Sequence, residues 1–165
     1  MKIQRPKSKH AEAIAKICSN GWRQTVEGLL SEEYQQKTIE HWYNTERVKK
    51  DIKAGDYSYI ALIDSEVVGV IGGGKTDNHV GEIFVLYVDE KVRYKGVGTK
   101  LLDRLTEDQR GAGVLEQWVS VQEGNYRGIP FYEARGFGLK EKRIRITETC
   151  EEQVSLRYWR KVDSF

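Results

Sequence analysis

The sequence predicts an α/β domain with a mixed, mostly antiparallel central sheet flanked by helices. Apolar residues follow helical spacing over residues 11–22, which predicts a helix that buries one face. Over residues 57–63 and 66–72 the apolar residues recur at every second position, and this alternation of apolar and polar residues is typical of half-buried strands. Residues 81–105 then read as a strand, a short glycine turn and an amphipathic helix.

The N-terminal part is expected to be mainly helical. A short strand over residues 2–5 ends at Pro6, which cannot donate to a sheet. Ser8 is expected to cap the first helix and Ser31 the second. The charged segment 46–53 is expected to continue the helical region by another turn or two.

A hairpin is predicted around Asp64–Ser65, with the following strand as a third antiparallel neighbour. The segment Gly69–Thr76 also matches G-x-x-x-x-G-K-T, the phosphate-binding loop of nucleoside triphosphatases. That loop requires a helix at its end and a crossover of about a dozen residues or more before a parallel strand. The chain is already back in a strand by Phe84. The hairpin is therefore the interpretation that fits.

The second half of the chain alternates between helix and strand signals. Gly111-Ala-Gly ends the helix that follows the glycine turn. The expected order for the whole chain is β-α-α-β-β-β-α-β-α-β-β, which one domain over residues 1–165 accommodates. Its last elements are a strand at 115–121, a helix at 125–135 and strands at 139–147 and 153–161.

The turn between the central strand and its helix has the chemistry of an anion site. Residues 83–88 form a continuous apolar run, typical of a strand covered on both faces, and Arg93-Tyr-Lys-Gly-Val-Gly-Thr99 follows. Gly96 and Gly98 let backbone N–H groups approach a ligand at little conformational cost. The first N–H groups of a helix have no internal partner, and the helix dipole is positive there. With two basic side chains beside them, they predict a site for a pyrophosphate or similar anion.

Composition narrows the function classes. Lys+Arg 27 against Asp+Glu 25 leaves a net charge of +2, so no overall field favours nucleic acid or a membrane surface. No apolar run approaches the roughly 18 residues that a membrane helix needs, and the first residues lack the apolar core of a secretory signal. Cys18 and Cys150 show no metal-ligand spacing, so no metal is expected. A buried Cys18 and a reducing cytoplasm fit this pattern.

Two blocks of the sequence resemble the GNAT superfamily of acetyl-CoA-dependent N-acetyltransferases. The first is Leu86–Val88 followed by Arg93-x-x-Gly96-x-Gly98, which is similar to that family's [Gln/Arg]-x-x-Gly-x-[Gly/Ala] pattern. The second is Val119–Val121, then Asn125, then Pro130–Phe137. Two blocks in the correct order are more specific than a lone glycine turn. The resemblance implies the GNAT fold, in which the sheet splays beside the central strand and acetyl-CoA lies in the cleft.

The resemblance also implies which residues hold the cofactor. The backbone of the central strand would pair with the pantetheine arm, as an added strand does, and the turn would hold the pyrophosphate. Asn125 would bond the cofactor arm, and Lys95 or Arg127 would reach the 3′-phosphate. The implied cofactor-binding residues are Leu86, Tyr87, Val88, Arg93, Tyr94, Lys95, Gly96, Val97, Gly98, Thr99 and Asn125.

Acetyl transfer from a thioester to an amine needs a neutral amine, a stabilised carbonyl oxygen and a proton for the departing thiolate. Tyr132 matches the position of the family's tyrosine general acid, and a phenol pKa of about 10 is close to that of a thiol; the alternative is a core aromatic residue. A backbone N–H at Tyr87 or Val88 would serve the oxygen. Glu82 is the candidate base that removes a proton from the amine, and the alternative is that Glu82 is merely solvated. His79, in the expected hairpin turn, is a second candidate for the base.

The resemblance thus predicts a cytoplasmic enzyme that moves an acetyl group from acetyl-CoA to a primary amine by direct attack in a ternary complex. The acceptor is expected to be a small molecule such as a polyamine or an amino-acid derivative. Trp22, Tyr34 and Trp42 would either wall its pocket or belong to the core. Two alternatives stay open: acetylation of a protein N-terminus or lysine, and a non-catalytic acyl-CoA-binding sensor. The two late strands would support a homodimer.

Overall fold

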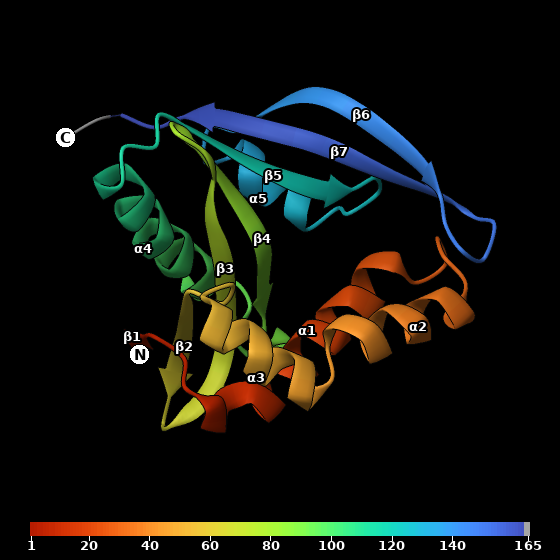
Figure 1. Ribbon diagram of the computed structural model, residues 1–165, viewed down its shortest axis with the longest axis horizontal. Helices are drawn as coiled ribbons and strands as arrows, with labels where there is room; N and C mark the ends of the chain where they lie inside the picture. The colour runs from red at the N-terminus through yellow and green to blue at the C-terminus, as the bar shows by residue number, and fades with distance from the viewer. Residues whose placement is uncertain (164–165) are drawn as a thin grey trace.

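The computed structural model describes residues 1–163 and contains a seven-stranded sheet with helices on both faces (Figure 1). Residues 164 and 165 of the expected domain lie outside the described part. The strands are β1 (Lys2–Gln4), β2 (Tyr59–Ile63), β3 (Glu66–Asp77), β4 (Val80–Val88), β5 (Glu116–Gln122), β6 (Gly138–Ile146) and β7 (Glu152–Lys161). The helices are α1 (Ala11–Val26), α2 (Glu32–Trp42), α3 (Thr45–Ala54), α4 (Val97–Gly111) and α5 (Gly128–Glu133), with short 3-10 turns η1 (Ser8–His10) and η2 (Glu90–Val92).

The strands lie in the order β1-β2-β3-β4-β5-β7-β6, and β4–β5 is the parallel pair among them. This confirms the predicted mixed, mostly antiparallel sheet. Asp64 and Ser65 both have positive φ, 50° and 65°, as a two-residue hairpin turn between twisted strands requires. The glycine-rich segment Gly69–Thr76 lies inside β3, so the hairpin interpretation is also confirmed.

The N-terminal helices differ in detail from the prediction. Ser8 begins η1, and α1 starts later, after His10, with no side-chain cap, so the predicted Ser8 cap is wrong. Ser31 does cap α2, because its hydroxyl accepts the Tyr34 N–H at 3.2 Å.

The charged segment 46–53 belongs to a separate helix, α3, rather than to an extension of α2. Asn44 caps the start of α3, since its side-chain oxygen accepts the Arg47 N–H at 2.8 Å. Gly55 ends it in the left-handed conformation with φ 86°.

Two apolar clusters hold the helices to the sheet. On one face, α1 and α3 pack on β2 and β3, and Cys18 is fully buried there, as expected. On the other face, α4 and α5 pack on β2 to β5 and β7, around residues such as Leu101, Leu102 and Tyr132. Helices therefore pack on both faces of the sheet at β3, the strand that pairs with the central strand β4.

The sheet divides beside β4. β4 pairs with β5 only from Val80↔Glu116 to Ile83↔Val119. The register against β3 also shifts at this point, which leaves Phe84 as a bulged residue that is 49% exposed. Residues 85–88 are half-buried, with Val85 and Tyr87 packed against one apolar cluster and Leu86 and Val88 against the other. The prediction of a strand covered on both faces therefore fails at the exposed Phe84 and holds only partly beyond it, whereas the predicted splay is confirmed.

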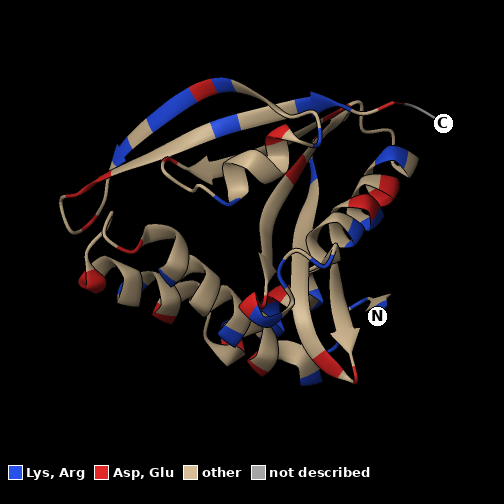
Figure 2. Ribbon diagram, turned by 180° about the vertical axis from the view of Figure 1, so that it is seen from behind, with Lys and Arg blue, Asp and Glu red and all other residues tan. Residues whose placement is uncertain are grey.

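Beyond the splay, β5, β7 and β6 form a second wing of the sheet. Basic residues recur along both β6 and β7 of this wing (Figure 2). Trp159 lies off the buried alternation of β7 and stacks on Trp118 of β5, with ring centroids 6.1 Å apart. No helix within residues 1–163 has the length and hydropathy of a membrane span.

Candidate active site

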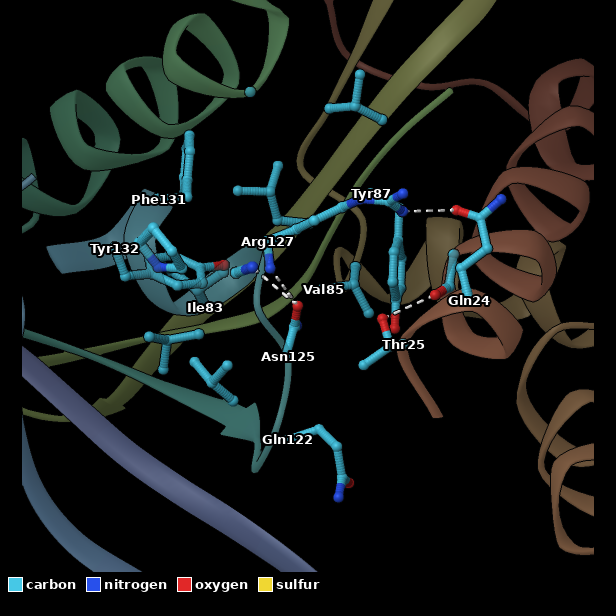
Figure 3. Close-up of a pocket in the computed structure, with 18 of the residues that line it drawn as sticks. Gln24, Thr25, Ile83, Val85, Tyr87, Gln122, Asn125, Arg127, Phe131 and Tyr132 are labelled. Atoms are coloured by element: carbon cyan, nitrogen blue, oxygen red, sulfur yellow. Dashed lines mark hydrogen bonds between the residues drawn. The ribbon is translucent and has the colours of Figure 1, made fainter. Parts of the chain in front are cut away.

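A cleft of about 940 Å³ occupies the space where β4 and β5 part (Figure 3). One side is formed by β4 and α1, and the other by β5, α5 and the start of β7. The turn after β4 and the first residues of α4 close one end. The cleft therefore follows directly from the short β4–β5 pairing.

The edge of β4 that faces the cleft has free backbone groups. The Asp89 N–H donates to the Val68 carbonyl at 2.8 Å on the β3 side. In an antiparallel pair the direction of the N–H groups alternates, so Tyr87 also faces β3, whereas Leu86 and Val88 turn their N–H and C=O groups toward the cleft. This edge can accept one more extended strand-like ligand.

The turn from Arg93 to Thr99 forms the anion cradle at the closed end. Gly96 has φ 80° and is the residue before α4, and a Cβ there would meet nothing within 4 Å. Tyr94 also has positive φ, 64°, and its side chain is 95% exposed. Because α4 begins at Val97, the N–H groups of its first turn have no helical partner and lie along the cleft wall. These donors fit a diphosphate.

Gly98 lets α4 approach α5. A Cβ on Gly98 would lie 3.3 Å from the Phe131 ring, which is tighter than an ordinary contact. Nη2 of Arg135 donates to the Thr99 hydroxyl, and the Arg135 guanidinium lies over the Phe131 ring. The start of α4 is thus fixed against α5 through the second of the two sequence blocks.

Asn125 lies in the cleft wall and also caps α5. Its side-chain oxygen accepts N–H groups from Arg127 at 3.3 Å and Gly128 at 2.8 Å. Its amide nitrogen remains as the donor for a ligand in the cleft.

Tyr132 extends from α5 into the interior of the cleft (Figure 3). Its ring is buried between Phe131 and Phe137, with centroids 5.2 and 5.3 Å away. Desolvation by burial raises the pKa of Tyr132, so the phenol keeps its proton at neutral pH. Within residues 1–163 no hydrogen bond involves its hydroxyl, which is therefore available to a ligand.

Glu82 lies beside the cleft rather than in its lining, at the point where β4 and β5 part. Both carboxylate oxygens accept from Arg157, at 2.5 Å and 2.9 Å, and Arg157 also donates to the Ser120 hydroxyl at 2.8 Å. The hydrogen bond with Glu82 raises the pKa of Arg157. Because Ser120 does line the cleft, the pair reaches the cleft through that hydroxyl.

The other sequence candidates are divided between the cleft and distant positions. His79 lies in the β3–β4 turn, as predicted, where its Nδ1 is 3.0 Å from the Gly113 carbonyl oxygen. Trp42 is 46% exposed under Arg47, away from the cleft. Trp22 lines the cleft, and its buried indole N–H has no partner within residues 1–163. Tyr34 packs edge-on against Trp22 at 6.2 Å.

Sequence reasoning missed a set of polar residues that line the cleft, and we call the part of the cleft that they line the acceptor end. They are short or uncharged polar side chains that no motif marks, because each comes from a different element. The set is Thr25 from α1, Ser120 and Gln122 from β5, and Gln153 and Ser155 from β7.

A second set of contacts joins the two sides of the molecule at the acceptor end. The Ser31 N–H and hydroxyl donate to the two carboxylate oxygens of Glu151 at 2.6 and 2.7 Å. The Tyr34 hydroxyl donates to the Gln153 side chain at 3.0 Å. These contacts bring the β6–β7 turn against the start of α2 (Figure 1), so we call them the acceptor latch.

Metal ligands do not gather anywhere in the described part of the chain. Within residues 1–163 no three His, Cys, Asp or Glu side chains lie close enough together to hold a metal ion. Cys18 and Cys150 are unpaired.

Comparisons with known proteins agree with this geometry. A family model described as the acetyltransferase (GNAT) family matches residues 19–137. A spermidine N(1)-acetyltransferase of Thermoplasma acidophilum is 27% identical over 135 residues, which cover 79% of this chain and 83% of that protein. A crystal structure of the PaiA N-acetyltransferase of Thermoplasma acidophilum in complex with coenzyme A has a TM-score of 0.80 at 24% identity, covering 97% and 98% of the two chains. A structure of Ard1 from Thermoplasma volcanium has a TM-score of 0.71 at 21% identity, covering 99% and 98%.

Proposed function

Because the chain belongs to the GNAT family of acetyl-CoA-dependent N-acetyltransferases, we propose that its acceptor is a primary amine of a small molecule. The acceptor latch is the observation that carries this proposal. Ser31–Glu151 and Tyr34–Gln153 join the start of α2 to the β6–β7 turn across the acceptor end, which suits a small molecule better than a protein segment. A polyamine is the first class to test, since a relative is a spermidine N(1)-acetyltransferase.

Acetyl-CoA supplies the activated thioester. The side chains and backbone amides of the cleft bind the cofactor, stabilise the carbonyl oxygen and transfer the protons. The cofactor-binding residues that we propose are those of the free β4 edge, the turn from Arg93 to Thr99, and Asn125. The alternation of β4 favours the Val88 N–H over that of Tyr87 as the donor to the thioester carbonyl oxygen.

Tyr132 is proposed as the proton donor to the departing thiolate. It is the phenol that projects into the cleft without an internal partner, and because burial raises its pKa the hydroxyl keeps its proton in the resting site and can donate it in a hydrogen bond to the departing sulfur. The amine then attacks directly while both substrates are bound.

Glu82 is proposed as the base that removes the proton of the incoming ammonium group. Arg157 engages both of its oxygens, and the path to the cleft runs past the Ser120 hydroxyl. We therefore propose that the proton reaches Glu82 through water rather than by direct contact.

The unpaired cysteines agree with the proposed cytoplasmic location.

The test is a panel of acceptors assayed by acetyl-CoA-dependent thiol release, with each product identified by mass. The panel contains polyamines, amino-acid amides, peptides with free N-termini and lysine peptides. Turnover of the small amines over the peptides is the expected result. Preference for a peptide would refute the small-molecule proposal in favour of protein acetylation, and tight CoA binding without turnover of any amine would favour the sensor.

A further inference from the structure

One buried donor in the lining of the cleft has no partner in the protein. Trp22 lies on α1, and its ring packs against the small apolar cluster of Val26, Leu30 and Tyr34. Its indole N–H is buried and makes no hydrogen bond with any residue from 1 to 163. A buried donor without a partner costs free energy, and a ligand in the cleft would relieve that cost. An indole N–H only donates, so the ligand group must be a hydrogen-bond acceptor.

Gln153 presents a second unpaired donor from the other side of the cleft. It belongs to β7 and lines the acceptor end. Its side-chain oxygen accepts from the Tyr34 hydroxyl at 3.0 Å and from Nε of Arg145 at 3.1 Å, and these two contacts fix the orientation of the amide. In the described part of the chain its amide nitrogen donates to no other group, so this nitrogen is also left for a ligand.

Tyr34 brings these two donors to neighbouring points. Its ring lies edge-on to the Trp22 ring, with centroids 6.2 Å apart, and its hydroxyl donates to Gln153. The N–H groups of Trp22 and Gln153 therefore belong to one part of the cleft, although they come from a helix and a strand more than 100 residues apart in sequence. One oxygen-bearing group of a small ligand can serve both.

The charges around the cleft do not favour an acceptor with several positive charges. Arg93, Arg127 and Arg135 line the cleft, and its lining within residues 1–163 includes no Asp or Glu. Glu82, beside the cleft, is already paired with Arg157. A polyamine is protonated on its nitrogens at neutral pH, and its ammonium groups only donate hydrogen bonds. Such a chain would offer no acceptor to the two unpaired donors.

We propose that Trp22 and Gln153 bind a carbonyl oxygen of the acceptor, so that the preferred substrate is a primary amine that carries an uncharged carbonyl group, such as an amino-acid amide. Both residues determine specificity and take no part in the chemistry. The inference rests on the proposed function, because it names the class of small amine that the same site takes.

The test compares two amines of similar size at saturating acetyl-CoA: alaninamide, which has the carbonyl oxygen, and 2-aminobutane, which lacks it. Each kcat/KM of a variant is divided by the wild-type value for the same amine, so that the different basicities of the amines cancel. Trp22→Phe keeps an aromatic ring and removes the N–H. We expect kcat/KM for alaninamide to fall by about fivefold, as for loss of a neutral hydrogen bond, and that for 2-aminobutane to stay the same. Trp42→Phe is the matched control, because Trp42 is outside the cleft lining.

Gln153→Glu tests the second donor. The new side chain keeps an oxygen for Tyr34 and Arg145 but loses the amide N–H groups. We expect kcat/KM for alaninamide to fall by about fivefold and that for spermidine to rise, because the carboxylate attracts ammonium groups. CoA affinity, measured by calorimetry, should be unchanged in both variants, which shows that each is folded.

Equal changes for alaninamide and 2-aminobutane in both variants would overturn the inference. Turnover of 2-aminobutane but not of alaninamide by the wild-type enzyme would overturn it as well, and so would a loss of spermidine turnover in Gln153→Glu that equals the loss for alaninamide. All three results leave small amines as the acceptors. Preference for peptides in the acceptor panel would instead refute the proposed function, and the ratios for the two small amines would still report on the indole and amide N–H groups.

Discussion

The two ends of the cleft are built in different ways. The cofactor end is local: one continuous stretch, from β4 through the turn into α4, supplies the free strand edge, the glycines and the unpaired helix N–H groups. The acceptor end is assembled from α1, the start of α2, β5 and β7, with partners such as Ser31 and Glu151 that lie 120 residues apart in sequence.

This difference separates backbone chemistry from side-chain chemistry. In the proposed function, the cofactor end would bind a constant ligand mainly with main-chain groups, whose placement depends on local conformation. The acceptor end would bind a variable ligand with side chains, whose placement depends on tertiary packing. Substitutions at the cofactor end should therefore alter cofactor binding alone, and substitutions at the acceptor end should alter the acceptor alone.

The largest effect is expected from Gly96→Glu. The substitution places a carboxylate at the anion cradle and forces a non-glycine residue to φ 80°. We expect CoA affinity, measured by calorimetry, to fall by about 100-fold, because a like charge replaces open space beside the phosphate. Gly113→Glu is the matched control at the other end of α4, since Gly113 has φ 89° and equally open surroundings. Equal CoA affinity in the two variants would remove the cradle from the cofactor site.

Tyr132→Phe should lower kcat by about 100-fold, the usual contribution of a positioned proton donor. CoA affinity should stay the same, because only the hydroxyl is lost from a ring held by Phe131 and Phe137. Since burial raises the pKa of Tyr132, the phenol stays protonated below the ordinary value of about 10, and no loss of wild-type rate from its ionisation is expected up to that pH. Tyr126→Phe is the control, on a 74% exposed tyrosine of the same cleft.

A wild-type kcat in Tyr132→Phe, under conditions where single-turnover measurements show that chemistry limits the rate, would contradict the proposed role. The ring would then be a packing residue, as the alternative interpretation of the sequence holds.

Much of the fold was predictable because its signals are local. The hairpin at Asp64–Ser65, the Ser31 cap and the glycine turn each depend on a few neighbouring residues, and all three occur as expected. The partial exposure of residues 84–88 was not predictable from their apolar character. It arises from the bulge at Phe84 and the parting of β4 from β5, which are properties of strand pairing.

The residues of the candidate site also differ in whether local sequence signals reveal them. The turn from Arg93 to Thr99 could be found in the sequence, whereas Gln153 gives no signal in a strand and is oriented only by its contacts with Tyr34 and Arg145. The partner of Glu82 was equally hidden, because Arg157 lies 75 residues away in sequence and two strands away in the sheet.

Glu82→Gln should have an intermediate effect. We expect kcat/KM for the acceptor to fall by about tenfold, because the carboxylate that receives the proton of the ammonium group is gone. Glu123→Gln is the control, since it also breaks an ion pair, the one with Lys142 at 2.9 Å. If Arg157→Gln, which breaks the same contact but keeps the carboxylate, lowers kcat/KM as much as Glu82→Gln does, Glu82 acts as a structural link to Arg157 and another group is the base.

The smallest effect is expected at the acceptor latch, and it tests the separation of the two ends most directly. Glu151→Gln keeps one acceptor for Ser31 but loses the charge that strengthens both contacts. Hydrogen bonds from Thr149 and Ser31 hold the pKa of Glu151 below its ordinary value, so the latch is charged at neutral pH in the wild type. We expect the KM of the acceptor to rise about threefold, with CoA affinity unchanged. Glu152→Gln, on the exposed next residue, is the control. A matching loss of CoA affinity in Glu151→Gln would show that the ends are coupled through α1 and would break the comparison.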